Sequence, residues 1–430
     1  MTENETRRAV AIVGALFFVI GFVTWLNGPL ISFVQVAFGR NEAGGFLVPL
    51  VFYISYLLFA LPSAAILRRT GMKRGLVLAL LVMAAGTAAF GECVSLRSFG
   101  GALGGLFVIG AALSLLQTAI NPYVSVVGPI DTAARRIALM GICNKIAGLL
   151  APVVLGLLAL RGMNAAAARI AAATDPAARE ALLDGFARQV QLPYLVLAVL
   201  LLLAALALQF SSLPDIDPAR QNAGHVSPVA PQAAGSGLPR ASNLWFGVVA
   251  LFLYVGVEVM AGDAIGTYGR GFGLSLDQTK FLTSLTLAAM VLGYIAGMAA
   301  IPRLMSQERY LACSAALGIV LSTVALFTTG MVSVLFVALL GFANAMMWPS
   351  IFPLAIRGLG ARTETGAALL VMGICGGALL PQLFVLLKQH WNMQIGFWLV
   401  TAPAYAVIGI FALWGARVPA VSALSAPRPA

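Results

Sequence analysis

The tetrapeptide Met-Gly-Ile-Cys occupies residues 140–143 and recurs 232 positions later, at residues 372–375. Ala-Ala-Ile-Leu-Arg at residues 64–68 is matched by Ala-Ala-Ile-Pro-Arg at residues 299–303, which is 235 positions later. Both offsets are slightly more than half of the 430-residue chain, and chance identity of one short peptide does not explain two matches at nearly the same spacing. The chain therefore contains two homologous halves that follow one another in the same direction.

The composition of the chain places both halves in a membrane. Hydrophobic residues make up 60% of the sequence, charged residues only 10%, and the mean hydropathy is +0.96. A soluble core could not hide that much apolar surface, so we predict an all-α integral membrane protein. Runs of about 20 apolar residues are long enough to cross a bilayer as helices. Twelve such runs can be assigned, at residues 9–36, 46–67, 75–96, 101–125, 137–160, 190–211, 244–269, 279–302, 310–329, 331–356, 364–388 and 393–415.

These runs divide the chain into two sets of six transmembrane helices. We predict a first half at residues 1–211, a linker at residues 212–242, a second half at residues 243–417 and a tail at residues 418–430. The linker is rich in Pro, Gly, Ser, Gln and Asn, which is a composition that does not form a membrane helix. Two membrane halves repeated in parallel are typical of transporters that bind their substrate between the halves.

The net charge of +11 reports membrane topology and gives no reason to expect a nucleic-acid partner. If both termini are cytoplasmic, sixteen Lys and Arg residues lie inside and only five lie in short outer loops. That asymmetry follows the positive-inside rule. Four further Arg residues fall on the Ala-rich stretch at residues 161–188, which we expect to form a short surface helix outside the membrane.

The chain offers little for an enzyme or a metal site. Its four cysteines have no Cys-x-x-Cys spacing, and its two histidines, His225 and His390, lie in the linker and at an outer helix end. No glycine-rich nucleotide loop is present in the sequence. We therefore expect no catalytic residues, no metal and no cofactor.

Ionisable residues within membrane helices are candidate functional residues because they are costly to place there. At about 1.5 Å per residue, Lys145 on the fifth helix and Glu258 on the seventh come out near mid-membrane. Asp263 follows Glu258 by five residues, towards the outer mouth. Lys145 and Glu258 either form a structural ion pair that locks the halves together, or at least one of them contacts substrate or titrates during transport.

Uncharged polar residues accompany these charges on the same helices. Amides both donate and accept hydrogen bonds, as sugar hydroxyl groups do, and indole rings offer flat faces for a pyranose ring. The candidate side chains for binding a neutral, polyhydroxylated solute are Trp25, Asn27, Gln117, Asn121, Asn144, Lys145, Asn344 and Trp348. Pro122, Pro349 and Pro353 are expected to weaken the backbone hydrogen bonding of the fourth and tenth helices.

Three motifs resemble those of one transporter family. They are Gly-Phe-Val-Thr-Trp-Leu-Asn-Gly-Pro-Leu at residues 21–30, Leu-Gln-Thr-Ala-Ile-Asn-Pro-Tyr at residues 116–123, and Gly-Phe-Ala-Asn-Ala-Met-Met-Trp-Pro at residues 341–349. The chain thereby resembles the fucose, galactose and glucose symporter family of the major facilitator superfamily. The resemblance implies the twelve-helix major facilitator fold and alternating access. It further implies a multi-pass protein of the bacterial inner membrane that takes up a monosaccharide with a cation, and we expect a monomer in the lipid bilayer.

Two departures from the family pattern sharpen the expected function. Gly28 and Gln117 stand where fucose-transporting members carry carboxylates, so the chain resembles more closely the branch that takes up N-acetylglucosamine, glucose or galactose. The coupling ion is expected to be a proton, with Na+ as the alternative. Our hypothesis is that Glu258 titrates during transport, that Lys145 tunes it, and that Asp263 assists. A drug or metabolite exporter of the same fold is the alternative function.

Overall fold

The computed structural model describes residues 3–126, 133–160, 162–211, 213, 238–301, 303–357, 359 and 363–415. Within these residues, twelve helical segments are long and apolar enough to cross a membrane. The prediction of an all-α, twelve-span membrane protein is confirmed. Most of the predicted linker at residues 212–242 and all of the predicted tail at residues 418–430 lie outside the described residues, so these boundaries stay predictions.

The first six spans are built from residues 3–209. Their helices and the helices that connect them are α1 (Glu3–Thr24), α2 (Asn27–Ala37), α3 (Glu42–Gly45), α4 (Leu47–Thr70), α5 (Met72–Ser95), α6 (Phe99–Val126), α7 (Ala133–Leu158), α8 (Met163–Ala172), α9 (Pro176–Arg188) and α10 (Gln191–Gln209). Our prediction of a single surface helix at residues 161–188 is wrong, because two helices, α8 and α9, occupy this stretch. Asp175 separates them by capping the N-terminus of α9.

The second six spans are built from residues 238–415. They comprise α12 (Leu238–Gly262), α13 (Ile265–Arg270), α14 (Leu276–Thr279), α15 (Leu282–Ala300), α16 (Gln307–Phe327), α17 (Gly330–Asn344), α18 (Met347–Ile356), α19 (Thr363–Met372), the 3-10 turn η3 (Gly373–Cys375), α20 (Gly376–His390) and α21 (Met393–Gly415).

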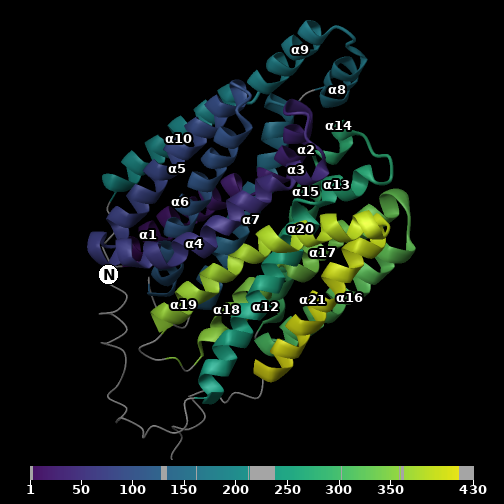
Figure 1. The fold of residues 1–430 in the computed structure, drawn as a ribbon. Coiled ribbons are helices and arrows are strands. Elements are labelled where there is room, and N and C mark those ends of the chain that lie inside the picture. Colours follow the sequence, from purple (N-terminus) through teal and green to yellow (C-terminus); the bar gives the residue numbers. More distant parts are fainter. Residues whose placement is uncertain are drawn as a thin grey trace, which may run out of the picture.

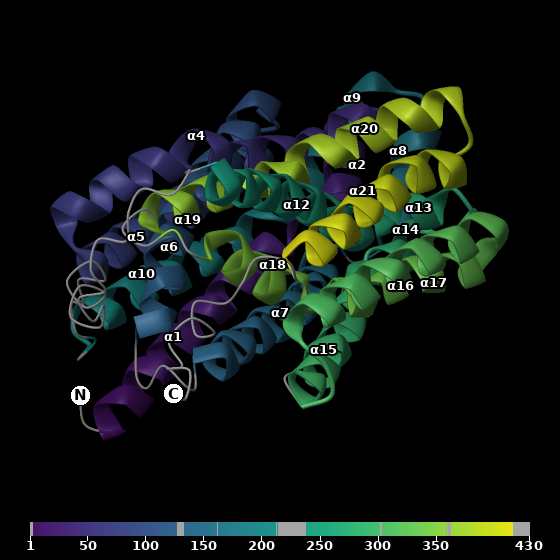
Figure 2. The same cartoon turned by 90° about the horizontal axis from the view of Figure 1, so that it is seen from below.

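The two sets of helices stand side by side in one bundle (Figure 1), with the first set in purple to teal and the second in green to yellow. They meet along two seams, one between α7 and α15 and the other between α4 and the pair α19 and α20. Seen from below, α7 and α15 lie next to each other along the lower side of the view (Figure 2). Any solute that passes between the halves must pass between these seams.

Two of the spans are interrupted where a proline forbids the next backbone hydrogen bond. The ring of a helical proline clashes with the carbonyl group four residues earlier. Pro29 lies four residues after Trp25, where α1 gives way to α2, and Pro349 lies four residues after Ala345, where α17 gives way to α18. The weakening that we predicted around Pro349 thus coincides with a break, whereas α6 runs unbroken through Pro122.

The seventh span breaks without a proline, at a position that corresponds to the break in the first span. The carbonyl group of Val259 accepts from both Asp263 (2.7 Å) and Ala264 (3.3 Å), after which α13 begins. The two breaks pack directly against each other. A Cβ atom on Gly262 would lie 2.2 Å from the Trp25 ring, so only glycine permits this approach.

One end of the bundle is closed by side chains that cap helices of the opposite half. The Asp277 carboxylate accepts from the backbone N–H groups of Met163 (3.3 Å) and Asn164 (3.2 Å), the first two residues of α8. In return, the Asn164 amide oxygen accepts from the N–H group of Leu276, the first residue of α14, at 2.9 Å. Each half therefore satisfies helix-end donors that the other half leaves without an intrahelical partner.

Further polar contacts join the halves at the same end, where α2, α3, α8, α9, α13 and α14 gather (Figure 1). Arg270 donates to the Gln35 side chain at 2.8 Å, and Lys388 pairs with Glu42. Burial lowers the pKa of the Arg270 guanidinium, and the nearby Glu42 carboxylate opposes that change. Gln382 donates to the carbonyl oxygen of Phe46 at 2.7 Å. We refer to this end of the bundle as the closed end.

We expect Asp277→Ala to favour opening of the closed end. Loss of a capping side chain costs about 0.5–2 kcal/mol, and 1 kcal/mol changes a conformational ratio about fivefold. The measurement is the labelling rate of Ser284→Cys by a membrane-impermeant maleimide, in a background without the native cysteines. Ser284 is suited to report opening because it donates across the seam to the Leu149 carbonyl oxygen at 2.8 Å.

Asp184→Ala is the matched control for this prediction. Asp184 is an exposed carboxylate on α9 whose partner, Arg97, belongs to the same half. Its removal should leave the labelling rate unchanged. Equal labelling of the Asp277→Ala and Asp184→Ala proteins would show that the inter-half caps do not hold the closed end shut.

Candidate functional site

A cavity of about 310 Å³ lies between the halves. The first half contributes lining residues from α1, α4, α6 and α7, and the second half contributes residues from α12, α15, α18 and η3. The lining runs from Trp25, at the break of the first span, to Ile137 near the start of α7 and Ile356 at the end of α18. The cavity thus extends from mid-bundle towards the end opposite the closed end.

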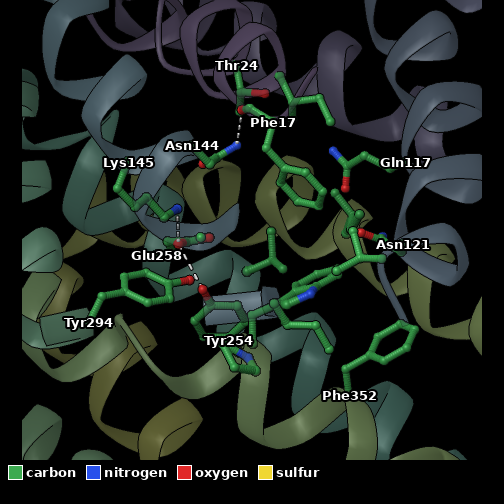
Figure 3. Close-up of a pocket in the computed structure, with 18 of the residues that line it drawn as sticks. Phe17, Thr24, Gln117, Asn121, Asn144, Lys145, Tyr254, Glu258, Tyr294 and Phe352 are labelled. Atoms are coloured by element: carbon green, nitrogen blue, oxygen red, sulfur yellow. Dashed lines mark hydrogen bonds and ion pairs between the residues drawn. The ribbon is translucent and has the colours of Figure 1, made fainter. Parts of the chain in front are cut away.

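An ion pair between the halves lies at the inner limit of the cavity (Figure 3). The Lys145 ammonium on α7 donates to Oε1 of Glu258 on α12 at 2.8 Å, and the Tyr254 hydroxyl donates to the same oxygen at 2.8 Å. The ammonium also lies 4.6 Å from the centre of the Trp25 ring. Both charged side chains are about nine-tenths buried. The structure therefore contains the ion pair of the first interpretation, whose two charges cancel, and substrate contact or titration by either residue stays a prediction.

Amide side chains occupy the wall of the cavity that faces this ion pair (Figure 3). Gln117 on α6 donates to the Tyr56 hydroxyl at 2.9 Å, and Asn121 lies one turn further along the same helix. On the side of the ion pair, Asn144 of α7 donates to the Phe17 carbonyl oxygen at 3.3 Å. Hydrogen-bonding groups therefore face each other across the cavity, where they could bind opposite edges of a polar solute.

Aromatic rings form a further wall on the side of the second half. Trp348 and Phe352 stack with ring centres 5.9 Å apart and an angle of 22° between their planes. The Tyr254 ring lies 6.5 Å from Trp348 in a tilted arrangement. Such a wall provides a broad apolar face of the kind that packs against the carbon-bound hydrogens of a ring-shaped solute.

Three of the candidate residues lie outside the cavity lining. Asn344 is 1% exposed, and its amide oxygen accepts from the Tyr405 hydroxyl at 2.9 Å. Asn27 and Asp263 are each 1% exposed and lie at the two helix breaks, behind the cavity. The other candidates, Trp25, Gln117, Asn121, Asn144, Lys145, Trp348 and Glu258, all line it. In this conformation, neither Asn27 nor Asn344 therefore has a side chain in the cavity lining that could contact a substrate there.

Among the polar lining residues, sequence reasoning missed Thr24 and Tyr294. Tyr294 on α15 points towards the ion pair (Figure 3). Tyr294 could have been recognised in the sequence, because its hydroxyl group lies near the middle of the apolar run at residues 279–302. Thr24 gave no comparable signal, since threonine side chains commonly bond their own helix backbone. In the described part of the chain, no group of three or more His, Cys, Asp or Glu side chains could hold a metal ion.

A cavity between two six-span halves, lined by amides, an ion pair and aromatic rings and closed at one end, defines a membrane transport protein. The profile of the Major Facilitator Superfamily matches residues 13–381, and the chain belongs to this family. It is 31% identical over 426 residues, or 97% of each chain, to the "Glucose/galactose transporter" of Brucella abortus. It is 26% identical over 408 residues to the "L-fucose-proton symporter" of Escherichia coli, which covers 94% of this chain and 92% of that one.

A solved structure shares the fold. The crystal structure of the Major Facilitator Superfamily transporter FucP in the outward conformation superposes with a TM-score of 0.75 at 25% sequence identity. The superposition covers 96% of this chain and 99% of that chain. The expected fold and the family resemblance are both confirmed.

A double-mutant cycle should reveal strong coupling between Lys145 and Glu258. Lys145→Met or Glu258→Gln alone leaves one buried charge unpaired, which typically costs about 3–5 kcal/mol. The double variant leaves no unpaired charge and should be destabilised less than the sum of the single variants. The midpoint of thermal denaturation in detergent measures the effect.

The ion pair of Arg97 and Glu180 serves as the control, because its carboxylate is 62% exposed. Exposed ion pairs contribute at most about 1 kcal/mol, so replacing either partner should shift the midpoint little. Additive effects at Lys145 and Glu258, like those expected for this exposed pair, would contradict the prediction.

Proposed function

We propose that this protein takes up a neutral monosaccharide, coupled to a cation, across the bacterial inner membrane. The candidate substrates are a hexose such as glucose or galactose, and N-acetylglucosamine. The names of the relatives support a sugar as the transported solute, and family membership supports transport without chemical change of that solute. The structural observation that carries the proposal is the cavity. Its lining combines amide side chains, an ion pair whose charges cancel, and a wall of aromatic rings.

The charge balance of the cavity favours a neutral solute over an ionic one. Because Lys145 and Glu258 compensate each other at 2.8 Å, neither is available as the counter-ion of a charged substrate. Gln117, Asn121 and Asn144 supply both donors and acceptors, which match the dual character of hydroxyl groups. A volume of about 310 Å³ lies at the lower end of the range for small-molecule sites, about 300–1,000 Å³, and suits a single sugar ring.

We assign the roles of the candidate residues on this basis. Trp25, Gln117, Asn121, Asn144, Lys145 and Trp348 bind the sugar from the cavity wall. Asn27 and Asn344 support this wall from behind, each almost fully buried. Glu258 and Asp263 are the two carboxylates available for coupling to a proton; Na+ is the alternative coupling ion.

The proposed orientation makes the described conformation inward-facing. With both termini in the cytoplasm, the closed end with its inter-half caps faces outward and the cavity faces the cytoplasm. Alternating access then requires breaking the contacts of Asp277, Asn164 and Arg270, and forming a new closure around Ile137 and Ile356.

Uptake of labelled sugars by cells that lack their own permeases tests the proposal. We expect uptake of at least one of glucose, galactose and N-acetylglucosamine, and unlabelled sugars competing against it should rank the three. A protonophore should abolish accumulation if the ion is a proton, whereas sodium-dependent, protonophore-resistant uptake identifies Na+. Absence of uptake across all hexoses and amino sugars rejects the function.

Gln117→Ala should raise the sugar concentration needed for half-maximal uptake about fivefold. This factor corresponds to loss of one neutral hydrogen bond, about 1 kcal/mol. Gln191→Ala is the matched control, because Gln191 lies outside the cavity and donates to Glu92 on the surface. Equal half-saturation constants for the two variants would place the sugar away from Gln117.

A further inference from the structure

Asp263 is a buried carboxyl group that the cavity does not explain. It follows the last residue of α12, at the break of the seventh span, and is 1% exposed. Neither carboxyl oxygen has a hydrogen-bond partner among the described residues. Glu258 and Asp263 are the two carboxylates that the described part of the chain buries, and only Glu258 has a cation beside it.

The surroundings of Asp263 offer neutral groups but no free cation. The donors that face it are the backbone N–H of Gly28 and the hydroxyl of Tyr53, neither of which reaches hydrogen-bonding geometry. A Cβ atom on Gly28 would lie 3.2 Å from Oδ1 of Asp263, so the first residues of α2 leave just enough room for the carboxyl group. The Thr283 hydroxyl is already used, because it donates to the Gly262 carbonyl oxygen at 2.7 Å.

The charged and titratable groups that act on Asp263 come from three helices. They are Tyr53 on α4, Lys145 on α7 and Glu258 on α12, whereas α2 and α15 present Gly28 and Thr283. Lys145 is engaged with Glu258 at 2.8 Å and cannot serve both carboxylates equally. A negative charge on Asp263 would therefore be buried, without a hydrogen bond and close to the negative charge of Glu258.

We propose that Asp263 is the carboxyl group that carries the coupling proton, and that it is protonated in the conformation described here. An unpaired ionised carboxylate is strongly disfavoured in a dry protein interior, and protonation removes that charge. Glu258 keeps its ion pair with Lys145 and its hydrogen bond from Tyr254, and these contacts hold the two halves together. The inference rests on the proposed function, because a coupling proton requires a transporter that accumulates its solute.

The position of Asp263 gives it access to alternate sides of the membrane. Its neighbour Gly28 belongs to the other half, so opening of the closed end separates the two and admits outside water to the carboxylate. In the described conformation Tyr53 lines the cavity and faces Asp263. The proton can leave by this route once the Tyr53 side chain moves into hydrogen-bonding distance of Asp263. The Asp263 O–H bond breaks as its proton passes to the Tyr53 oxygen, and the original hydroxyl proton of Tyr53 passes to water in the cavity, which becomes hydronium. Asp263 is left as a carboxylate that accepts a hydrogen bond from the new Tyr53 hydroxyl group.

Infrared spectroscopy of the purified wild-type protein and its variants tests the proposal without any sugar. A protonated carboxyl group shows a carbonyl stretch that a carboxylate lacks. We expect this band at neutral pH in wild type and in the double variant Lys145→Gln/Glu258→Gln, in which Asp263 is the remaining buried carboxyl group among the described residues. Asp263→Asn should lose it, and Asp184→Asn, at an exposed site, should keep it. A band that persists in Asp263→Asn and disappears in the double variant would falsify the proposal.

Transport in membrane vesicles provides the second test. An inward proton gradient of about one pH unit supports up to about tenfold accumulation for one proton per sugar. Wild type should accumulate labelled galactose accordingly, whereas Asp263→Asn should only equilibrate it, with a ratio of one, while still exchanging it across the membrane. Accumulation by Asp263→Asn equal to wild type overturns the proposal. If wild type exchanges no sugar at all, the proposed function fails, and the infrared result alone decides the protonation of Asp263.

Discussion

The ion pair between Lys145 and Glu258 is the interaction on which the arrangement of the cavity depends. It joins α7 of the first half to α12 of the second half, deep in the bundle, where each charge would be very costly alone. Because the two charges cancel, the pair adds no net charge to the cavity, whose other polar lining groups are mainly amides and the tips of aromatic side chains. Trp25, stacked on the ammonium and packed against Gly262, connects this pair to the helix breaks behind it.

The helix breaks explain how a bundle of long helices provides both a cavity and a closed end. Pro29 and Pro349 interrupt the backbone hydrogen bonding of spans one and ten, and the seventh span breaks beside Asp263. At the breaks of spans one and seven the two halves approach through Gly28 and Gly262, and the short helices beyond these breaks, α2 and α13, contact each other. The resulting contact separates the cavity from the opposite side of the membrane. The same breaks bury Asn27 and Asp263, which a continuous helix would have presented to the cavity or to the seam.

The membrane spans and the depth of the buried charges could be predicted from the sequence, for reasons that the structure makes clear. Long apolar runs identify spans because each must satisfy its own backbone in the bilayer, and rise per residue alone places Lys145 and Glu258 at similar depth. Their pairing could not be predicted, because helix rotation and the contact between α7 and α12 depend on tertiary packing. The neighbourhood of Gly28 and Asp263 was equally hidden, since these residues are 235 positions apart. Asn344 was misleading because an amide in a membrane helix serves equally well as a partner for another helix, here through Tyr405.

The helical hairpin of α8 and α9 breaks the symmetry of the two halves. Spans five and six are joined by these two helices, whereas spans eleven and twelve are joined by Trp391 and Asn392 alone. A repeat protein with equivalent ends would have two conformations of similar free energy, but in the part of the chain that the structure describes, side chains that cap helices of the opposite half are found at the closed end only. Since the Asp277 and Glu42 carboxylates at the closed end are each about one-third exposed, dissolved salt at that surface weakens the attraction between its charges. The resting conformation of the molecule is thereby set in part by the ionic composition of the medium it faces.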